Sequence, residues 1–183
     1  MKCFVTGHTS GVGKAIYDHF ISKGWDVAGM SRSNGYDIVT DQDKIELEVS
    51  GCDLFVNCAY SGQGQLELLN RLHDKVKNII VVGSVASEWA DVWKPYGLDK
   101  LELEKRCREI SVIDDPGLAK IFYLKLSFCE NAQWPLNLDD RYKTTFNEIN
   151  EVIDIWLKIP RIYSVEFVLK ETDEIVDAVR KFK

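Results

Sequence analysis

The residues best suited to chemistry in this sequence are a serine, a tyrosine and a lysine. Tyr96 and Lys100 are four positions apart, so on a helix their side chains share one face. A phenol has a pKa of about 10 and is a weak acid–base catalyst at neutral pH unless a nearby cation, here Lys100, favours its ionised form. Ser84 lies 12 residues before Tyr96, at the end of an apolar run. The pattern predicts an acid–base site; the alternative is a solvated pair on a surface helix.

A glycine-rich segment follows the first apolar run and precedes the first helical pattern. It reads Thr6-Gly7-His8-Thr9-Ser10-Gly11-Val12-Gly13. Glycines at such a turn let the backbone approach a phosphate, whose charge is stabilised by free N–H groups at the helix N-terminus. The predicted cofactor-binding residues of the segment are Gly7, Thr9, Ser10, Gly11, Val12 and Gly13. His8 is expected to contribute nothing, and an ordinary strand-to-helix turn is the alternative.

The T-G-x-x-x-G-x-G spacing, together with Ser84, Tyr96 and Lys100, resembles the short-chain dehydrogenase/reductase family. The resemblance extends from Lys2 to about Leu126 and is weaker beyond. It implies that Tyr96 is the acid or base, that Ser84 orients the substrate oxygen, and that Lys100 also anchors the ribose of a nicotinamide cofactor. The reaction implied is hydride transfer between the nicotinamide and a small carbonyl or alcohol substrate.

The type of cofactor is suggested by the end of the second apolar run. Ser31 and Arg32 stand where an acid would bind the ribose of NAD. A guanidinium has paired donors that suit a 2′-phosphate, so these residues favour NADP; the alternative is an exposed loop arginine. The resemblance implies further cofactor contacts from Asp37, Ile38, Asn57 and Ala59. Asp37 and Asn57 could instead serve only a turn or a strand end.

The elements that position these residues alternate regularly along the chain. Uniformly apolar runs at 3–5, 27–30, 54–56, 79–82, 121–124 and 165–169 predict strands that are covered on both faces. Helical spacing predicts helices at 12–22, 41–49, 65–76, 96–110, 144–157 and 173–181. This order predicts a doubly wound parallel α/β sheet, a three-layer Rossmann fold, formed by residues 1–183 as a single domain.

Composition narrows the class of protein. The chain has 183 residues, 45% of them hydrophobic and 28% charged, as in a compact globular domain. A net charge of −6 argues against a nucleic-acid partner. No apolar run approaches the roughly 20 residues of a membrane span, and we expect no signal peptide. Five cysteines without a C-x-x-C pair are expected to be reduced and to bind no metal, which favours a cytoplasmic location.

Two departures from the family are visible. Only 27 positions separate Asn57 from Ser84, room for one short helix where the family has a longer one with a proton-relay asparagine. Gln63 and Asn70 are the nearest polar candidates, and neither is well placed. The longer helix commonly forms a dimer interface, so a homo-oligomer would have to use another surface, such as 96–110. Residues 126–129 stand where many members of the family have a proline-glycine turn beside the nicotinamide, so no cofactor contacts are predicted for that loop.

The substrate is not predicted, although its surroundings are. Trp89, Trp93 and Trp134 fall in the two segments expected to flank it, with Tyr60 and Phe128 as further aromatic candidates. They could equally anchor loops over the core. Glu88 and Asp91 could select a polar or cationic group, or could simply face solvent.

Two other functions fit the same motifs. One is a dinucleotide-sensing protein that keeps the cofactor cradle and lacks efficient chemistry. The other is a nucleotide-sugar epimerase or dehydratase of the extended branch of the family. Its substrate domain normally needs a longer C-terminal extension than the roughly 50 residues that follow Ser127.

Overall fold

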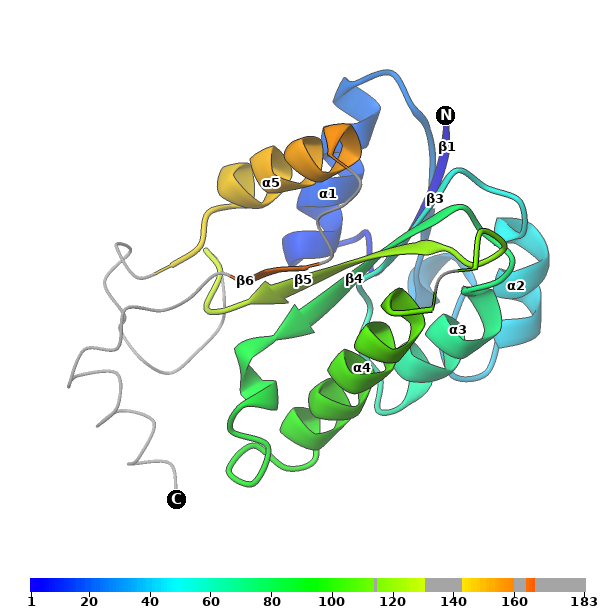
Figure 1. Cartoon of the computed structure of the whole chain (residues 1–183). Helices are drawn as coiled ribbons and strands as arrows, with labels where there is room; N and C mark the ends of the chain where they lie inside the picture. Colours follow the sequence, from blue (N-terminus) through cyan, green and yellow to red (C-terminus); the bar gives the residue numbers. More distant parts are fainter. Residues whose placement is uncertain (114, 131–142, 160–163, 167–183) are drawn as a thin grey trace.

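The computed structural model describes residues 1–113, 115–130, 143–159 and 164–166, which form one parallel sheet covered by helices (Figure 1). The strands are β1 Lys2–Thr6, β2 Asp26–Met30, β3 Leu54–Asn57, β4 Asn78–Ser84, β5 Lys120–Leu126 and β6 Ser164–Glu166. The helices are α1 Gly11–Ser22, α2 Gln42–Val49, α3 Gly64–Leu72, α4 Tyr96–Ser111 and α5 Phe146–Lys158, with short 3₁₀ helices η1 Arg32–Asn34 and η2 Val85–Ser87.

The sheet has the strand order β2-β1-β3-β4-β5-β6, with every pairing parallel. Strands β2 and β3 pair with opposite sides of β1. The connection after β1 therefore runs toward β2, and the connection after β3 runs in the opposite direction along the sheet, toward β4. Ligands of doubly wound sheets bind at the carboxyl ends of the strands at such a switch point. Among the described residues no strand lies outside β2, whereas the 3-2-1-4-5-6 order of dinucleotide-binding sheets has one there.

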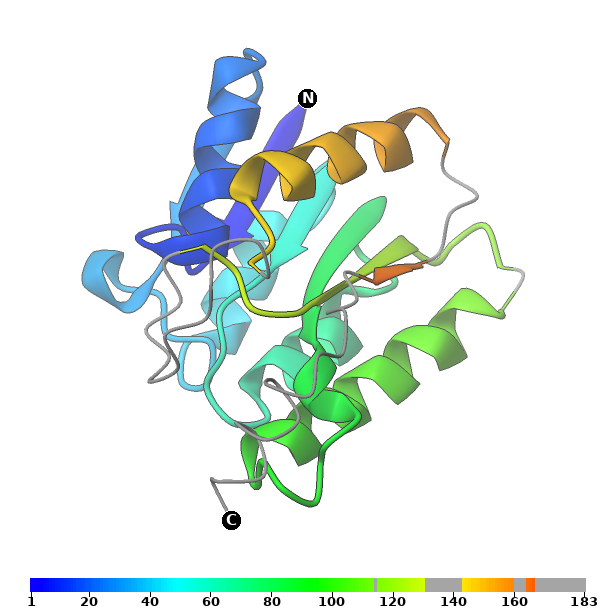
Figure 2. The ribbon, with the colours of Figure 1, turned by 90° about the vertical axis from the view of Figure 1, so that its left-hand side faces the viewer.

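Helices cover both faces of the sheet, which makes three layers. Helices α1 and α5 lie on one face and α2, α3 and α4 on the other, as the view turned by 90° also shows (Figure 2). The predicted doubly wound α/β/α fold is therefore confirmed. Because both faces are covered, the strand residues are apolar on both sides, and β3 is buried at every position.

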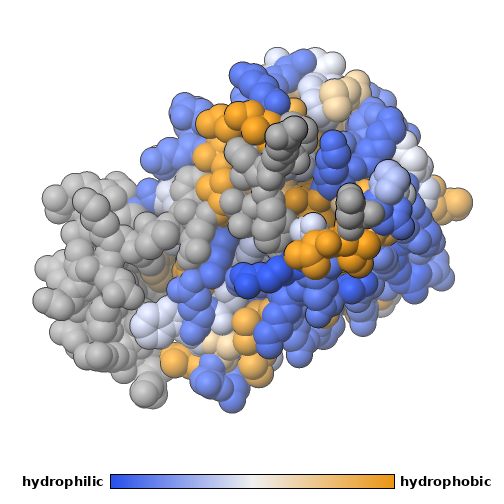
Figure 3. Space-filling model, in the orientation of Figure 1, coloured by the Kyte–Doolittle hydropathy of each residue, from blue (hydrophilic) through white to orange (hydrophobic). Residues whose placement is uncertain are grey.

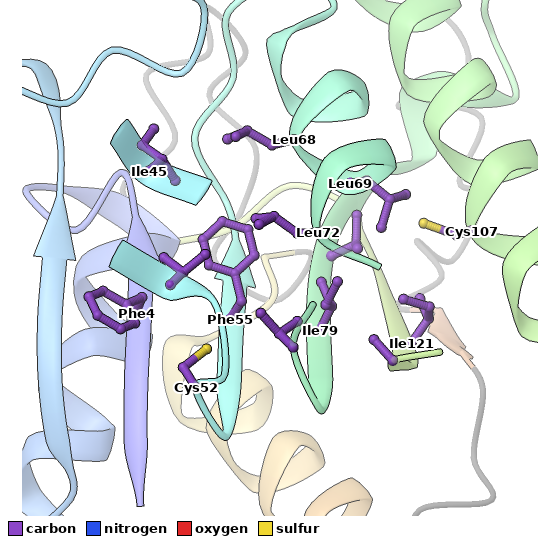
Figure 4. Packing of buried hydrophobic residues seen from close by; sticks show 14 of the residues in the cluster. Phe4, Ile45, Cys52, Phe55, Leu68, Leu69, Leu72, Ile79, Cys107 and Ile121 are labelled. Atoms are coloured by element: carbon purple, nitrogen blue, oxygen red, sulfur yellow. The ribbon is translucent and has the colours of Figure 1, made fainter. Parts of the chain in front are cut away.

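Two apolar clusters hold the layers together. On the α2–α3–α4 side, Phe4, Ile45, Phe55, Leu68 and Leu72 belong to one cluster between the sheet and the helices (Figure 4). The cluster beneath α1 and α5 contains Phe122 stacked on Trp156, with ring centroids 5.0 Å apart.

The predicted element boundaries are largely confirmed. Helix α3 ends at Leu72, whereas the sequence predicted a helix to residue 76. The chain turns there because β4 begins at Asn78, and Lys75 N–H bonds the Leu72 carbonyl at 3.0 Å. The predicted helix at 173–181 and residues 167–169 of the last predicted strand lie outside the described residues.

The described surface in Figure 3 is hydrophilic over most of its area, and its apolar side chains gather in a few patches. No helix within the described ranges combines the length and the apolar character needed to cross a membrane. The five cysteines are unpaired, and Cys3, Cys52 and Cys107 are buried.

Candidate functional site

The glycine loop between β1 and α1 has the backbone geometry of an anion cradle. Gly7 and Gly11 have φ of 73° and 55°, in the region that favours glycine. A Cβ at Gly13 would lie 2.3 Å from the Gly7 carbonyl oxygen, so only glycine lets the helix start this close to the loop. The Ser10 side chain does not cap α1, and the first turn has no acidic residue. The free N–H groups and the positive end of the dipole at the N-terminus of α1 are therefore available to a phosphate.

A cavity of about 570 Å³ opens beside this loop. Ten of the predicted cofactor residues line it: Gly7, Thr9, Ser10, Val12, Gly13, Ser31, Arg32, Asp37, Ile38 and Ala59. Met30, Ser33, Tyr36, Cys58, Tyr60 and Ser61 complete the lining. Gly11, Asn57 and Lys100 do not line it. Both the volume and the mixture of backbone, hydroxyl and charged groups suit a dinucleotide.

Thr6 fixes the distance between the two sides of the cavity, a role that the sequence did not reveal. Its buried hydroxyl donates to the Val56 carbonyl at 3.2 Å and accepts from the N–H groups of Cys58 and Ala59 at 2.9 and 3.0 Å. The end of β1 is thereby tied to the loop after β3. That tie holds Ala59 against Gly7, whose Cβ position lies 3.2 Å from the Ala59 Cα.

The outer end of the cavity is formed by the turn after β2. Ser31 is the N-cap of η1, and the Asn34 side chain accepts from Ser31 N–H and donates to the Gly29 carbonyl, both at 2.8 Å. Arg32 is exposed and makes no ion pair with the rest of the described chain. Asp37 lines the cavity and also accepts from Val39 N–H at 2.8 Å, so it serves the turn as well.

The structure brings Ser84, Tyr96 and Lys100 together at the carboxyl ends of the strands. Ser84 ends β4 and Tyr96 begins α4, and the two side chains are close enough for the Ser84 hydroxyl to affect the pKa of the Tyr96 phenol. The Lys100 ammonium lies 5.5 Å from the centroid of the Tyr96 ring, on the same face of α4. The prediction that the Tyr96 and Lys100 side chains lie on the same face of one helix is confirmed.

The ionisation of this pair differs from the sequence-based expectation. Burial raises the pKa of Tyr96, and the neighbouring Ser84 hydroxyl opposes this only in part. Burial also lowers the pKa of Lys100 to about 8. The expectation that Lys100 favours the phenolate is wrong for this structure, because the ammonium donates to Gln65 Oε1 and the Val82 carbonyl rather than to the phenol.

Tyr60 connects the cavity to the catalytic residues. It lines the cavity, and its ring packs edge-to-face on Tyr96 with centroids 4.8 Å apart. Its hydroxyl donates to Asp99 at 2.7 Å, and the Lys100 ammonium lies 5.4 Å from its ring centroid. The two predicted sites, one for the cofactor and one for acid–base chemistry, are therefore neighbours.

Asn57 has a different environment from the one predicted for a cofactor ligand. Its side chain is fully buried and donates to the Gln65 carbonyl at 2.8 Å, because the loop after β3 folds α3 back over the strand end. The amide that contacts Lys100 belongs to Gln65. Gln63 bonds Asp99 and Glu102 instead, and Asn70 bonds Arg106, so neither proton-relay candidate reaches the lysine.

The loop between β4 and α4 carries Trp89 and Trp93, two of the aromatic side chains expected to flank the substrate. Trp89 is 37% exposed, and Trp93 is partly buried. Glu88, considered as a substrate-selecting acid, instead accepts a hydrogen bond from the buried Lys125 at 2.6 Å. Asp91 pairs with Lys94. Trp134 lies outside the described residues.

No family model and no curated protein sequence matches this chain. Solved structures do match it in fold. The 3-alpha-hydroxysteroid dehydrogenase from Pseudomonas sp. B-0831, complexed with NADH, has a TM-score of 0.72 at 19% identity, over 97% of this chain and 99% of that chain. The bulky-bulky ketone specific alcohol dehydrogenase from Comamonas testosteroni gives 0.70 at 13%, over 98% and 92%.

An alcohol dehydrogenase from Thermococcus sibiricus, complexed with 5-hydroxy-NADP, gives a TM-score of 0.62 at 17% identity, over 91% of this chain and 95% of that chain. These similarities confirm that the chain has the Rossmann-type fold of the short-chain dehydrogenase/reductases. At such identities they establish the fold alone.

Proposed function

We propose that the protein is an NADP-dependent oxidoreductase of the short-chain type, which transfers hydride between the nicotinamide and a small carbonyl or alcohol substrate. The observation that carries this proposal is the meeting of Ser84, Tyr96 and Lys100 next to a glycine-lined cavity, with Tyr60 touching both. The solved structures of similar fold, two of them complexed with NADH or 5-hydroxy-NADP, are consistent with it.

The chain's own residues fit a dinucleotide at this place. The first turn of α1 would hold the pyrophosphate on its free N–H groups, and Ala59 backbone, Asp37 and Ile38 would contact the nucleoside portions. Arg32, exposed at the outer end, would bind the 2′-phosphate. Asp26 is at the opposite end of β2 and cannot take the place of a ribose-binding acid. When bound, the nicotinamide supplies or accepts the hydride.

Tyr96 is the proton donor in the reducing direction. Burial raises the pKa of Tyr96, so the phenol stays protonated at neutral pH, which is the form that can protonate a carbonyl oxygen. Ser84 supplies a second hydrogen bond to that oxygen from its single O–H group. Lys100 provides a cationic group near the Tyr96 ring, with its ammonium 5.5 Å from the ring centroid. Because this ammonium is buried and does not line the cavity, the ribose-anchoring role implied by the family resemblance stays a prediction.

The test is Tyr96→Phe, assayed by NADPH oxidation across a panel of carbonyl compounds. Loss of the proton donor should reduce kcat roughly 10²- to 10⁴-fold and leave NADPH affinity nearly unchanged. Tyr17→Phe, which removes a phenol from α1 far from Lys100, is the matched control. Unchanged turnover of Tyr96→Phe would exclude this assignment. Binding of NADPH without oxidation of it by the wild-type protein would indicate a dinucleotide-sensing role instead.

A further inference from the structure

We propose that Gln65 is a positioning residue that holds the Lys100 ammonium in place near the Tyr96 ring. The inference rests on the proposed function for its catalytic meaning. It concerns a side chain that touches neither substrate nor cofactor and acts through Lys100. The contacts that carry it are all among buried atoms.

The orientation of the Gln65 carboxamide is fixed by its donors. Its Nε2 group donates to the Asn57 carbonyl at 2.7 Å and to the Val82 carbonyl at 3.0 Å, which uses both amide hydrogens. The first carbonyl ends β3 and the second lies in β4. Because only Oε1 can accept, this oxygen is directed at Lys100, whose Nζ lies 2.6 Å away. In the flipped orientation, Oε1 would face the two carbonyl oxygens and the NH₂ group would face the ammonium, so all three hydrogen bonds would be lost.

The backbone of Gln65 is fixed as well. Asn57 Nδ2 donates to the Gln65 carbonyl at 2.8 Å, so the two residues form a reciprocal pair in which each side chain bonds the other's main chain. Gln65 is 2% exposed and lies in the first turn of α3. The acceptor for Lys100 is thus held by two strands and a helix, and it cannot follow the lysine if the lysine moves.

The acceptors of the buried Lys100 ammonium are uncharged, so its positive charge remains able to act on Tyr96. Lys100 is 3% exposed, and its described hydrogen-bond acceptors are Gln65 Oε1 and the Val82 carbonyl at 3.1 Å. Both are uncharged, so they hold the ammonium without neutralising it. The groups that face Lys100 are Cys58 from the loop after β3, Cys107 and Asp99 from α4, and the rings of Tyr60 and Tyr96. A carboxylate at position 65 would add a direct counter-ion to this set.

The first experiment measures Lys100 itself by NMR titration of ¹³C-labelled lysines, with Lys100→Met to assign its signal. Wild-type Lys100 should titrate near the value set by its burial, about pH 8. Gln65→Met removes an acceptor and should lower its pKa. Gln65→Glu keeps an acceptor and adds charge, and should raise its pKa by about one unit or more. These shifts do not depend on turnover, so they test Gln65 even if the proposed function fails.

The second experiment measures kcat and KM against pH for the same variants. Gln65→Met should lower kcat at least tenfold with a smaller change in KM, because Lys100 loses its fixed position. Gln65→Glu should recover part of kcat and move the alkaline limb of the profile to higher pH. The glutamate cannot donate to the Asn57 and Val82 carbonyls. If Gln65 had a purely structural role, Gln65→Glu would therefore not recover kcat.

The matched control is Gln42→Met. Gln42 is also a buried glutamine, 7% exposed, and it donates to the Ile38 carbonyl and to Glu67. It should lower stability without moving the titration of Lys100. The inference is overturned if the Lys100 pKa is the same in wild type, Gln65→Met and Gln65→Glu, or if Gln42→Met shifts it equally. If Gln65→Met does not fold, the test depends on Gln65→Glu alone: a higher Lys100 pKa supports the inference, and an unchanged or lower Lys100 pKa overturns it.

Discussion

At the scale of single residues, the site depends on side chains whose neighbours are fixed by contacts within the chain. The Tyr96 ring packs on that of Tyr60, and Lys100 is bonded to Gln65 and a strand carbonyl. Arg32, by contrast, is exposed at the outer end of the cavity. Replacement of Tyr96 or Lys100 should therefore also disturb the side chains that contact it, whereas replacement of Arg32 should affect only the binding of the cofactor.

We predict that Arg32→Ala weakens NADPH binding roughly 10- to 100-fold and leaves NADH binding nearly unchanged. The reason is the loss of charge-assisted hydrogen bonds to the 2′-phosphate, worth about 1.5–3 kcal/mol. Titration calorimetry with both cofactors measures the difference. The control is Lys44→Met, because Lys44 is a nearby cation that lies over the Tyr36 ring and does not line the cavity. Equal losses for the two cofactors would refute the phosphate role.

We predict that Gly13→Ala both destabilises the protein and abolishes most dinucleotide binding. The new Cβ would meet the Gly7 carbonyl oxygen at 2.3 Å, so the loop must move, at a cost of about 1–3 kcal/mol. Urea denaturation and NADPH titration measure the two effects. Gly51→Ala is the control, since Gly51 has φ 78° and no atom within 4 Å of an added Cβ. It should cost about 1 kcal/mol and leave affinity intact; a similar loss of affinity there would contradict the cradle.

At the scale of elements, helix α5 illustrates how a local signal fixes a helix start. Thr145 accepts from Glu148 N–H at 3.2 Å, and Glu148 accepts from Thr145 N–H at 2.7 Å, which forms a capping box. The helix then buries Ile149, Ile153 and Trp156 on the sheet. The cap fixes the start of the helix, and the helical spacing of these apolar residues places them on the face that packs on the sheet.

We predict that Thr145→Ala lowers the free energy of unfolding by about 1 kcal/mol, because one helix N–H loses its acceptor. Chemical denaturation followed by tryptophan fluorescence measures the change. Ser22→Ala should change stability by less than about 0.5 kcal/mol, since that exposed hydroxyl only donates to a carbonyl of its own helix. A Thr145→Ala variant as stable as wild type would show that the cap does not limit α5.

Sequence patterns predicted most elements and the Ser84, Tyr96 and Lys100 group, because these depend on spacing along one chain. They did not predict Gln65, although it precedes Leu68, Leu69 and Leu72 on the buried face of α3. A polar residue in an apolar stripe signals a buried hydrogen-bond network. Its partners come from β3, β4 and α4, so only the packed structure identifies them. The pKa of Tyr96 was also missed, because burial is not a property of spacing.

At the scale of the whole molecule, we expect the buried thiols to reduce stability at alkaline pH. Burial raises the pKa values of Cys3 and Cys107 well above their usual range and that of Cys52 to about 11. Each thiol ionises in the unfolded chain above pH 9 and stays protonated when folded, so its stabilisation is lost as pH rises. The loss is about 1.4 kcal/mol per pH unit for each thiol. Lys100, whose pKa burial lowers, opposes this between about pH 8 and 10.5 but offsets only one thiol.

We therefore predict that the free energy of unfolding falls steeply between pH 9 and 10.5. Urea denaturation at constant reductant from pH 7 to 10.5 measures the slope. Cys107→Ala should lower stability at pH 7, through the loss of packing, and should make the slope shallower by about 1.4 kcal/mol per unit. A slope that is flat above pH 9, or identical in the variant, would show that these thiols ionise in the folded state.

The five-residue β2 leaves one side of the sheet without a partner strand in the part of the chain that the structure describes. Open backbone rows of this kind attract strands from other molecules, and short or covered edges suppress such pairing. Asn34 already occupies the Gly29 carbonyl with its own amide. The turn that lines the cavity thereby also shields one carbonyl of this open edge from pairing with a strand of another molecule.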